Sequence, residues 1–393
     1  MREIAIIGIG QTPISENWSQ SLREIAGEAV LKALEDAGLT SCDGLFVGNM
    51  LSGLLSQQEN LGTLISDWVG IQYKEAFKVE AACGSGAAAL RMAVMSVSSG
   101  ELDCAIAVGV EKMTEMKGTE ITAALATAAD ADYEVIHGLS FVGINALVMQ
   151  RYMHEFGWKH ADFAPFSINA HANAVHNPNA RLREVISEKD YQRARMIADP
   201  INLLDASPIG DGAAAVVLVP ANLLKTSFSD ANNKKRPIVT IVGSAAATDT
   251  IAVHSRSDPL WLAAAEKSAR QAYIQAGIGP RDINLFELHD AFSIMSALSL
   301  EACGFAEQGQ GLRLGLDGRI SPQGQIPIAT LGGLKARGHP VGATGIYQIV
   351  EVVQQLRGEA GPTQVDGAKI GMAQNIGGSG ATIITHILRT GRN

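Results

Sequence analysis

Apolar positions along the chain alternate between two spacings, one typical of buried strands and the other of amphipathic helices. Short apolar runs predict strands at 3–8, 45–47, 104–109 and 213–219. Between the first two runs lies a helical pattern that begins at a Ser21/Glu24 capping box and ends at Gly38. This alternation of strands and helices predicts a parallel or mixed sheet with helices on both faces.

The same order begins again in the second part of the chain. Strands are predicted at 238–242, 284–288, 369–373 and 382–386. A predicted helix that begins at Asp258-Pro259 and ends at Gly277 corresponds to the helix of the first part that ends at Gly38. The chain therefore predicts two related α/β halves, with boundaries 1–236 and 237–393, and an inserted lobe of helices and loops at about 111–200.

Composition and charge exclude several classes of protein. The 393 residues are 47% hydrophobic and 18% charged, which suits a large buried core. A net charge of -9 leaves no basic face for nucleic acid, and Lys234-Lys235-Arg236 is predicted to be a solvated linker. No apolar run reaches the ~20 residues of a membrane span, and the N-terminus resembles a strand and not a signal peptide. We expect a cytoplasmic protein.

Several common motifs are absent. Gly8-Ile9-Gly10 follows a strand, but Pro13 stands where a dinucleotide-binding loop has its third glycine. There is no phosphate-binding G-x-x-x-x-G-K-[ST] loop and no G-x-S-x-G nucleophile elbow. The four cysteines are widely spaced, and no histidines have metal-ligand spacing. The sequence therefore predicts neither a disulfide framework nor a metal site.

One cysteine stands out by its position. Cys83 lies among small residues just before a predicted helix, where free N–H groups favour a thiolate. The alternative is a buried cysteine that serves only packing. When the two halves are aligned, Cys83 falls within two residues of His339. His289 is a second candidate, because it ends a predicted strand. Equivalent loops meet at a pseudo-two-fold axis, so one imidazole could take the thiol proton while the other donates to a developing oxyanion.

The chain resembles the thiolase superfamily, most closely archaeal-type acetyl-CoA acetyltransferases and sterol-carrier-protein-2-like thiolases. The resemblance rests on four segments, ACGSG at 82–86, HDAF at 289–292, GGLKARGHPVGATG at 332–345 and NIGG at 375–378. It implies the five-layered α-β-α-β-α thiolase fold, with duplicated halves and an inserted loop domain, assembled as a homodimer or homotetramer. It also implies no cofactor, because coenzyme A thioesters are the substrates.

The resemblance assigns roles position by position. Cys83 matches the nucleophile that accepts the acyl group, and His339 matches its base. His289 stands where many thiolases have an asparagine that holds an oxyanion-hole water. The backbone N–H groups of Cys83 and Gly377 match the second oxyanion hole, and Ser207 matches a serine near the pantetheine arm.

The sequence departs from the thiolase pattern at the second cysteine, which moves the α-carbon proton in thiolases. Its two known places hold Asn375 and Ala291. Cys303, on a predicted helix, is a substitute that packing explains better, and Cys104 in a predicted strand is a weaker one.

Three functions remain open. The first is an acetyl-CoA C-acyltransferase that uses His289 or a water as the base for condensation to, or thiolysis of, 3-ketoacyl-CoA. The second is decarboxylating condensation, as in ketoacyl synthases, with Cys83, His289 and His339. The third is a catalytically weak coenzyme-A-binding subunit, associated with hydroxymethylglutaryl-CoA synthase through a small zinc-containing OB-fold protein.

Overall fold

The computed structural model describes residues 2–224, 227–229 and 235–391. Its helices are α1 Leu22–Ala37, α2 Ser52–Leu55, α3 Leu61–Trp68, α4 Ser85–Ser99, α5 Gly118–Ala126, α6 Phe141–Phe156, α7 Ala164–Ala174, α8 Glu188–Arg193, α9 Ala263–Ala276, α10 Ser293–Ala302, α11 Gly311–Leu316 and α12 Thr344–Arg357. The strands of the large sheet are β1 Ile4–Gln11, β2 Gly44–Gly48, β3 Glu75–Val79, β4 Ala105–Glu111, β7 Gly212–Pro220, β10 Val239–Thr248, β11 Leu285–Glu287, β12 Ile370–Gly377 and β13 Thr382–Thr390. Two small ribbons pair β5 Met196–Ala198 with β6 Ile201–Asn202 and β8 Ser227–Ser229 with β9 Lys235–Pro237.

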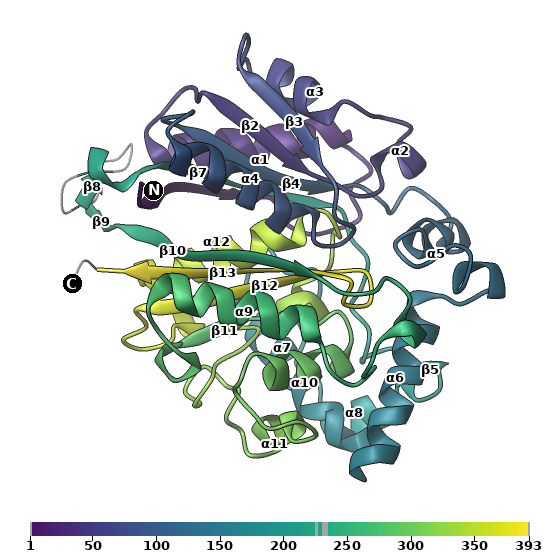
Figure 1. Cartoon of the computed structure of the whole chain (residues 1–393). Coiled ribbons are helices and arrows are strands. Elements are labelled where there is room, and N and C mark those ends of the chain that lie inside the picture. The colour runs from purple at the N-terminus through teal and green to yellow at the C-terminus, as the bar shows by residue number, and fades with distance from the viewer. Residues whose placement is uncertain (1, 225–226, 230–234, 392–393) are drawn as a thin grey trace.

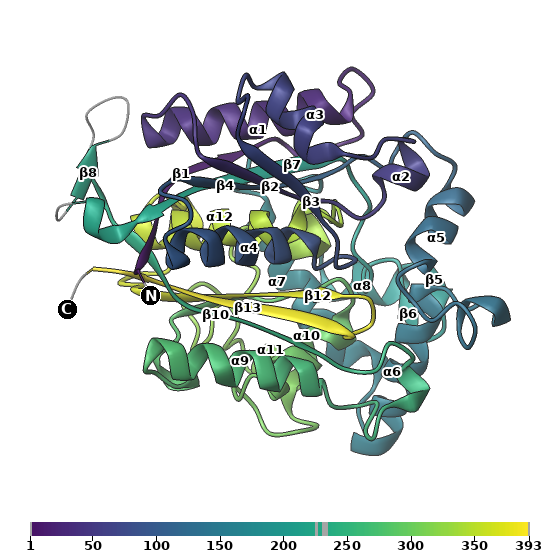
Figure 2. The same cartoon turned by 45° about the horizontal axis from the view of Figure 1, so that its top comes forward.

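The described elements form five layers (Figures 1 and 2). Helices α1 and α3 cover one outer face, and α9 and α10 cover the other, while α4 and α12 lie between the two parts of the sheet. The strand order is β11-β12-β13-β10-β1-β7-β4-β2-β3. Parallel pairs join β2 to β3 and β4 and join β11 to β12, and the other pairs are antiparallel. The mixed sheet and the layered architecture expected from the sequence are confirmed.

The two parts of the sheet are continuous, because β1 pairs with β10 through Ile4↔Ile241 and two further residue pairs. Topologically equivalent elements are β1 and β10, β2 and β11, β4 and β12, and α4 and α12. Helices α5 to α8 are inserted between β4 and β7. The position of the boundary between the halves stays a prediction.

Helix α12 is buried along nearly its whole length, as a central helix between two layers of strands must be. Its Ile346, Val350 and Val353 share one core cluster with Leu90 and Val97 of α4. The N-termini of these two helices carry the loops that hold Cys83 and His339. The packing of the middle layer therefore sets how the two loops face each other.

Two sequence expectations are wrong. Helix α9 begins at Ala263 and not at Asp258-Pro259, because Asp258 closes a turn in which its Oδ1 accepts from the Leu260 N–H at 2.8 Å. Arg236 is not a solvated linker residue, since its half-buried guanidinium pairs with Asp36 and lies 3.2 Å from Glu359. Lys234 lies outside the described residues. Across the described ranges, no helix combines the length and the apolar composition that crossing a bilayer requires.

Candidate active site

Cys83, His289 and His339 line one cavity of about 710 Å³. Each comes from a different segment, and both halves of the chain contribute. Ser207 and Ala291 also line the cavity, and most of the remaining wall is apolar, including Leu125, Phe141, Val142, Leu203, Leu204, Phe292, Met295 and Ile376. The structure therefore brings together the thiol and the two imidazoles that the sequence singled out.

A tight turn presents Cys83 just before α4. Ala82 adopts the left-handed region with φ +51°, which is uncommon for a residue with a side chain. Three hydrogen bonds hold it there: the Ala82 N–H donates to Glu80 Oε1 at 2.5 Å, the Ser85 hydroxyl donates to the Ala82 carbonyl at 2.6 Å, and the Ala81 N–H donates to the Ser85 hydroxyl at 2.9 Å. The turn therefore fixes the thiol at the cavity wall.

The resting thiol of Cys83 is protonated. Burial, reinforced by the nearby Glu111 carboxylate, raises the pKa of Cys83 to about 12, although the N–H groups of Cys83 and Gly378 act in the opposite direction. The helix N-terminus expected to favour a thiolate is present but does not outweigh desolvation. A base must therefore remove the proton before the sulfur can react.

His339 lines the same cavity and is the candidate for this base. Its backbone N–H donates to the Pro208 carbonyl at 3.1 Å, and its Nδ1 lies 2.7 Å from the Thr344 hydroxyl. The Thr344 hydroxyl also lies 3.1 Å from the Pro340 carbonyl, and when its single hydrogen is donated there it accepts from Nδ1–H. Nε2 then carries a free lone pair. Burial, with contributions from His289 and Arg337, holds the pKa of His339 well below its usual value, so the ring is neutral.

His289 lies edge-on to His339, with the ring centroids 5.1 Å apart. Its Nδ1 is 3.0 Å from Asn375 Nδ2, and burial lowers the pKa of His289 to about 3. Gln348 of α12 holds the segment after β11 next to β12, since its Nε2 donates to the carbonyls of Leu288 at 2.9 Å and Gln374 at 3.1 Å. The contact between His289 and Asn375 was not visible in the sequence.

Buried acids hold the surrounding loops. Asp290 accepts from the Leu334 N–H at 2.7 Å and so fixes the π-helical turn Gly333–Arg337 that leads to His339. Glu111 accepts from the side chain of Asn49 at 2.8 Å and from the N–H of Gly342 at 3.0 Å, tying a loop of the first half to the His339 loop. Both acids follow predicted apolar strands, which was the available sequence signal.

Lys335 is a further residue of the cavity wall that sequence reasoning missed. Its ammonium donates to the Asp205 carbonyl at 2.5 Å, and burial lowers the pKa of Lys335 to about 8. It lies within the glycine-rich segment at 332–345, so its position was marked although its role was not.

Gly377 is buried beside the Cys83 turn, where a Cβ would lie 2.3 Å from the Ala81 carbonyl oxygen. The neighbouring Gly378 lines the cavity, and its N–H acts on the thiol. Cys303 is buried, with Sγ 3.5 Å from Gln374 Oε1, and neither it nor Cys104 lines the cavity. Within the described residues, Cys83 is the one cysteine in the wall, and no three potential metal-binding side chains cluster.

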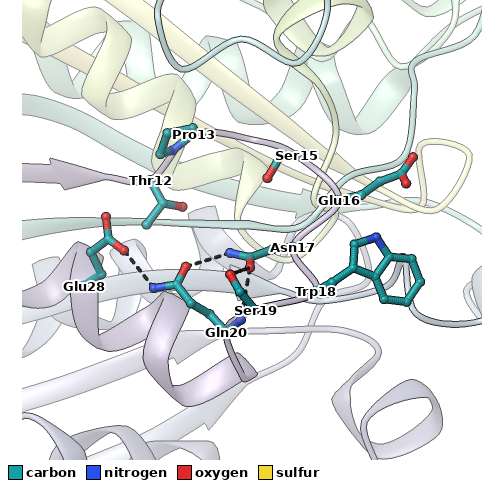
Figure 3. A pocket seen from close by; sticks show the side chains of 9 residues that line it. All are labelled: Thr12, Pro13, Ser15, Glu16, Asn17, Trp18, Ser19, Gln20 and Glu28. Carbon is teal, nitrogen blue, oxygen red and sulfur yellow. Dashed lines mark hydrogen bonds between the residues drawn. The ribbon is translucent and has the colours of Figure 1, made fainter.

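A second hollow, of about 500 Å³, lies beside α1 and is lined by Thr12, Pro13, the residues from Ser15 to Gln20, and Glu28 (Figure 3). Its polar side chains bond to one another: Asn17 Nδ2 donates to Gln20 Oε1 at 2.7 Å, and Gln20 Nε2 donates to the Glu28 carboxylate at 3.1 Å. It contains none of the predicted site residues. The chemistry is therefore concentrated in the cavity of Cys83.

Comparisons with known proteins identify the family of the chain. The thiolase N-terminal domain family matches residues 4–222, and the thiolase C-terminal domain-like family matches residues 245–390. Acetyl-CoA acetyltransferase of Methanothermobacter thermautotrophicus is 45% identical, covering 98% of this chain and 99% of its own length. Benzoylsuccinyl-CoA thiolase subunit of Thauera aromatica is 32% identical, covering 93% and 92%.

Solved structures give the same result. The structure titled "Ltp2-ChsH2(DUF35) aldolase" has a TM-score of 0.85 at 26% identity and covers 100% of this chain and 98% of the other. The Ascaris suum Acat5 thiolase in complex with coenzyme A has a TM-score of 0.71 at 16% identity, with coverage of 99% and 100%, which shows the fold alone. The predicted thiolase fold is confirmed, and the chain belongs to the thiolase family.

Proposed function

We propose that this protein is an acyl-CoA C-acyltransferase of the thiolase type, acting on short 3-ketoacyl-CoA such as acetoacetyl-CoA. The observation that carries the proposal is the cavity in which Cys83, His289 and His339 meet. The acetyl-CoA acetyltransferases to which the chain is similar over nearly its full length support the same chemistry.

The first half-reaction transfers an acyl group to Cys83. His339 Nε2 takes the thiol proton, and the sulfur forms a bond to the thioester carbon. The N–H groups around the sulfur, those of Cys83 and of Gly377 or Gly378, stabilise the oxyanion that forms. The bond to coenzyme A then breaks, and the departing thiolate takes the proton back from His339. Ser207 contributes to holding the pantetheine arm.

The second half-reaction joins the acyl group to the α-carbon of another acyl-CoA, and the reverse direction is thiolysis by coenzyme A. The apolar wall around Phe141, Met295 and Leu204 suits the acyl chain, because burying each CH₂ contributes roughly 0.8 kcal/mol. The proposed substrates are therefore acyl-CoA and coenzyme A, and no cofactor takes part in either step.

Intact-mass measurement tests the nucleophile. Incubation with acetyl-CoA should add one acetyl group to the wild-type protein and none to Cys83→Ala. Cys104→Ala is the matched control, because Cys104 is half-buried and lies outside the cavity wall. A wild-type mass that does not change would refute the assignment of Cys83.

Decarboxylating condensation is the second candidate, because the cavity combines one thiol with two histidines and has Ala291 at a usual place of the second cysteine. Loss of carbon dioxide would generate the carbanion without a base. Cleavage of acetoacetyl-CoA by coenzyme A, compared with carbon dioxide release from malonyl-CoA, separates the two. Release of carbon dioxide without thiolysis would favour the decarboxylating reaction.

A homodimer or homotetramer is proposed for the assembly in the cytoplasm. Association with hydroxymethylglutaryl-CoA synthase through a small zinc-containing OB-fold protein would make the chain one part of a larger complex, in which it could act as a weakly catalytic coenzyme-A-binding subunit. One similar structure carries a title that names Ltp2 together with ChsH2(DUF35). Light scattering of the protein alone and with these partners measures the assembly, and a monomer would contradict the proposal.

A further inference from the structure

Asn375 occupies a place where thiolases carry their second cysteine, and here it touches His289. We propose that Asn375 is a positioning residue that fixes His289 as an N–H donor, and that His339 alone moves the protons of both half-reactions. This inference rests on the proposed thiolase function. It explains how the carbon–carbon step proceeds without a second catalytic thiol.

The surroundings of Asn375 orient its amide group. The side chain is 2% exposed, and its Oδ1 faces the space in front of Gly345. A Cβ on Gly345 would lie 2.4 Å from both Asn375 Oδ1 and the Ala87 backbone nitrogen, so the oxygen faces the first turn of α4 but makes no hydrogen bond there. This turn carries the positive end of the helix dipole and favours an oxygen over an NH₂ group. The amide NH₂ is therefore directed at His289.

The two imidazoles consequently have opposite tautomers. Asn375 Nδ2 can only donate, so His289 Nδ1 accepts, and the ring proton of neutral His289 is on Nε2. The Thr344 hydroxyl accepts from His339 Nδ1–H, which leaves the lone pair on Nε2. His289 thus offers an N–H to the cavity but no base, and His339 offers a base. We therefore assign the base of the condensation step to His339 and not to His289, which the sequence suggested.

A cycle with one base balances in every proton. After acyl transfer, the thiolate of coenzyme A has taken the proton from His339, so Nε2 is again free. Nε2 then takes the α-proton of the second acyl-CoA, while His289 Nε2–H donates to the thioester oxygen that gains charge. The α-carbon electron pair forms the new bond to the acyl carbon on Cys83. The carbon–sulfur bond breaks, and the Cys83 thiolate receives the proton that His339 holds.

The geometry also explains why the base is available. Both rings are buried, and Arg337 lies close enough to disfavour a second positive charge on either of them. Arg337 itself is held by Glu351, with Nη1 2.6 Å from Oε2. The two histidines therefore stay neutral, as opposite tautomers require.

Nitrogen-15 NMR of histidine-labelled wild-type protein tests the tautomers directly. We expect His289 to carry its proton on Nε2 and His339 on Nδ1, with the signals assigned through His289→Gln and His339→Gln. The same tautomer on both rings would overturn the inference. This measurement needs no substitution at Asn375.

Asn375→Asp supplies the functional test. A carboxylate accepts from His289 Nδ1–H, so the Nε2 proton is lost and the enolate loses its donor. Acetylation of Cys83 should stay within about threefold of wild type, whereas exchange of the acetyl-CoA α-protons with deuterated water and thiolysis should fall about 100-fold, the size of effect that removal of one oxyanion donor has. The His289 NMR signals should change to the other tautomer.

Gln374→Glu is the matched control, because it places a carboxylate in the same strand without contacting either imidazole. It should keep both activities. If Asn375→Asp exchanges α-protons at the wild-type rate, the inference fails while the proposed function stands. If the wild-type protein does not form acetyl-Cys83 at all, the proposed function itself fails. Asn375→Leu, which removes the amide without adding a charge, should also lose α-proton exchange and retain acetylation.

Discussion

Gly86 is the position where a single methyl group should disturb both the packing and the site. It lies in the first turn of α4, against the loop that leads into α12. A Cβ at Gly86 would lie 2.8 Å from the Gly342 carbonyl oxygen and 3.2 Å from the backbone nitrogens of Gly345 and Ile346. Ordinary contact begins at 3.4 Å, so the two segments would have to separate by several tenths of an ångström.

The expected free-energy change combines two opposing effects. Replacing glycine by alanine in a helix stabilises by up to ~1 kcal/mol. Overpacking costs about 1–3 kcal/mol, and the upper part of this range applies because the neighbouring atoms belong to the backbone. Gly86→Ala should therefore lower the free energy of unfolding by about 2 kcal/mol. Gly143→Ala is the matched control in the first turn of α6, where a Cβ would lie 3.5 Å from Ser140 Oγ, and it should be neutral or stabilising.

Urea unfolding measures the stability of both variants, with the slope m expected to be unchanged. Acetylation of Cys83 is measured on the same samples. The loop that Gly86 contacts also carries His339. Separation of the two segments therefore moves the His339 imidazole away from the Cys83 thiol. Acetylation of Gly86→Ala should slow about 10-fold or more. A Gly86→Ala protein as stable as Gly143→Ala, with a wild-type acetylation rate, would refute this account of the middle layer.

Three further predictions concern buried charge. The rate of Cys83 acetylation should not fall from pH 7.5 to 5.5. His339 stays neutral over this range, and Glu111, with a pKa of about 7, loses the negative charge that opposes the Cys83 thiolate. A 10-fold fall would mean that the base has the ordinary pKa of a histidine. His386 has a pKa near 4 when folded and 6.5 when unfolded, so its contribution is lost as the pH falls below 6.5. His386→Gln should lose about 2 kcal/mol less stability than wild type between pH 7.5 and 5 in urea unfolding, and equal losses would contradict burial of the neutral ring. Arg337→Met leaves Glu351 unpaired and should destabilise by about 3–5 kcal/mol in the same assay; a loss below 1 kcal/mol would show that the pair is solvated.

Local patterns predicted the elements and several of their ends. Ser21 and Glu24 form the capping box, with the Ser21 N–H donating to Glu24 Oε2 at 2.7 Å, and Gly38 ends α1 in the left-handed conformation. These features depend on neighbours within a few residues, so the sequence contains them in full. Asp258-Pro259 failed as a helix start because the same residue type also favours a turn, and only the tertiary context decides between them.

The site was predictable as a set of residues but not as an arrangement. Motif order identified Cys83, His289 and His339, and the structure places all three in one cavity. The protonated state of Cys83 was not predictable, because the raised pKa depends on burial and on Glu111, which arrives from another strand. The place of Lys335 in the cavity wall was not predictable either, because it depends on how the loop folds.

The sequence by itself determined the alternation of strands and helices, the duplicated halves and the thiolase family, and it singled out Cys83 as the candidate nucleophile, because each of these is written in local periodicity or in contiguous motifs. The tertiary structure decided which groups that are far apart in the chain meet. Asn375 touches His289 although 86 positions separate them in the chain, and Glu111 accepts from the N–H of Gly342, in the loop that carries His339, across 231 positions. Contacts between residues so far apart in the chain, and the desolvation that makes such contacts decisive, arise only when the chain folds.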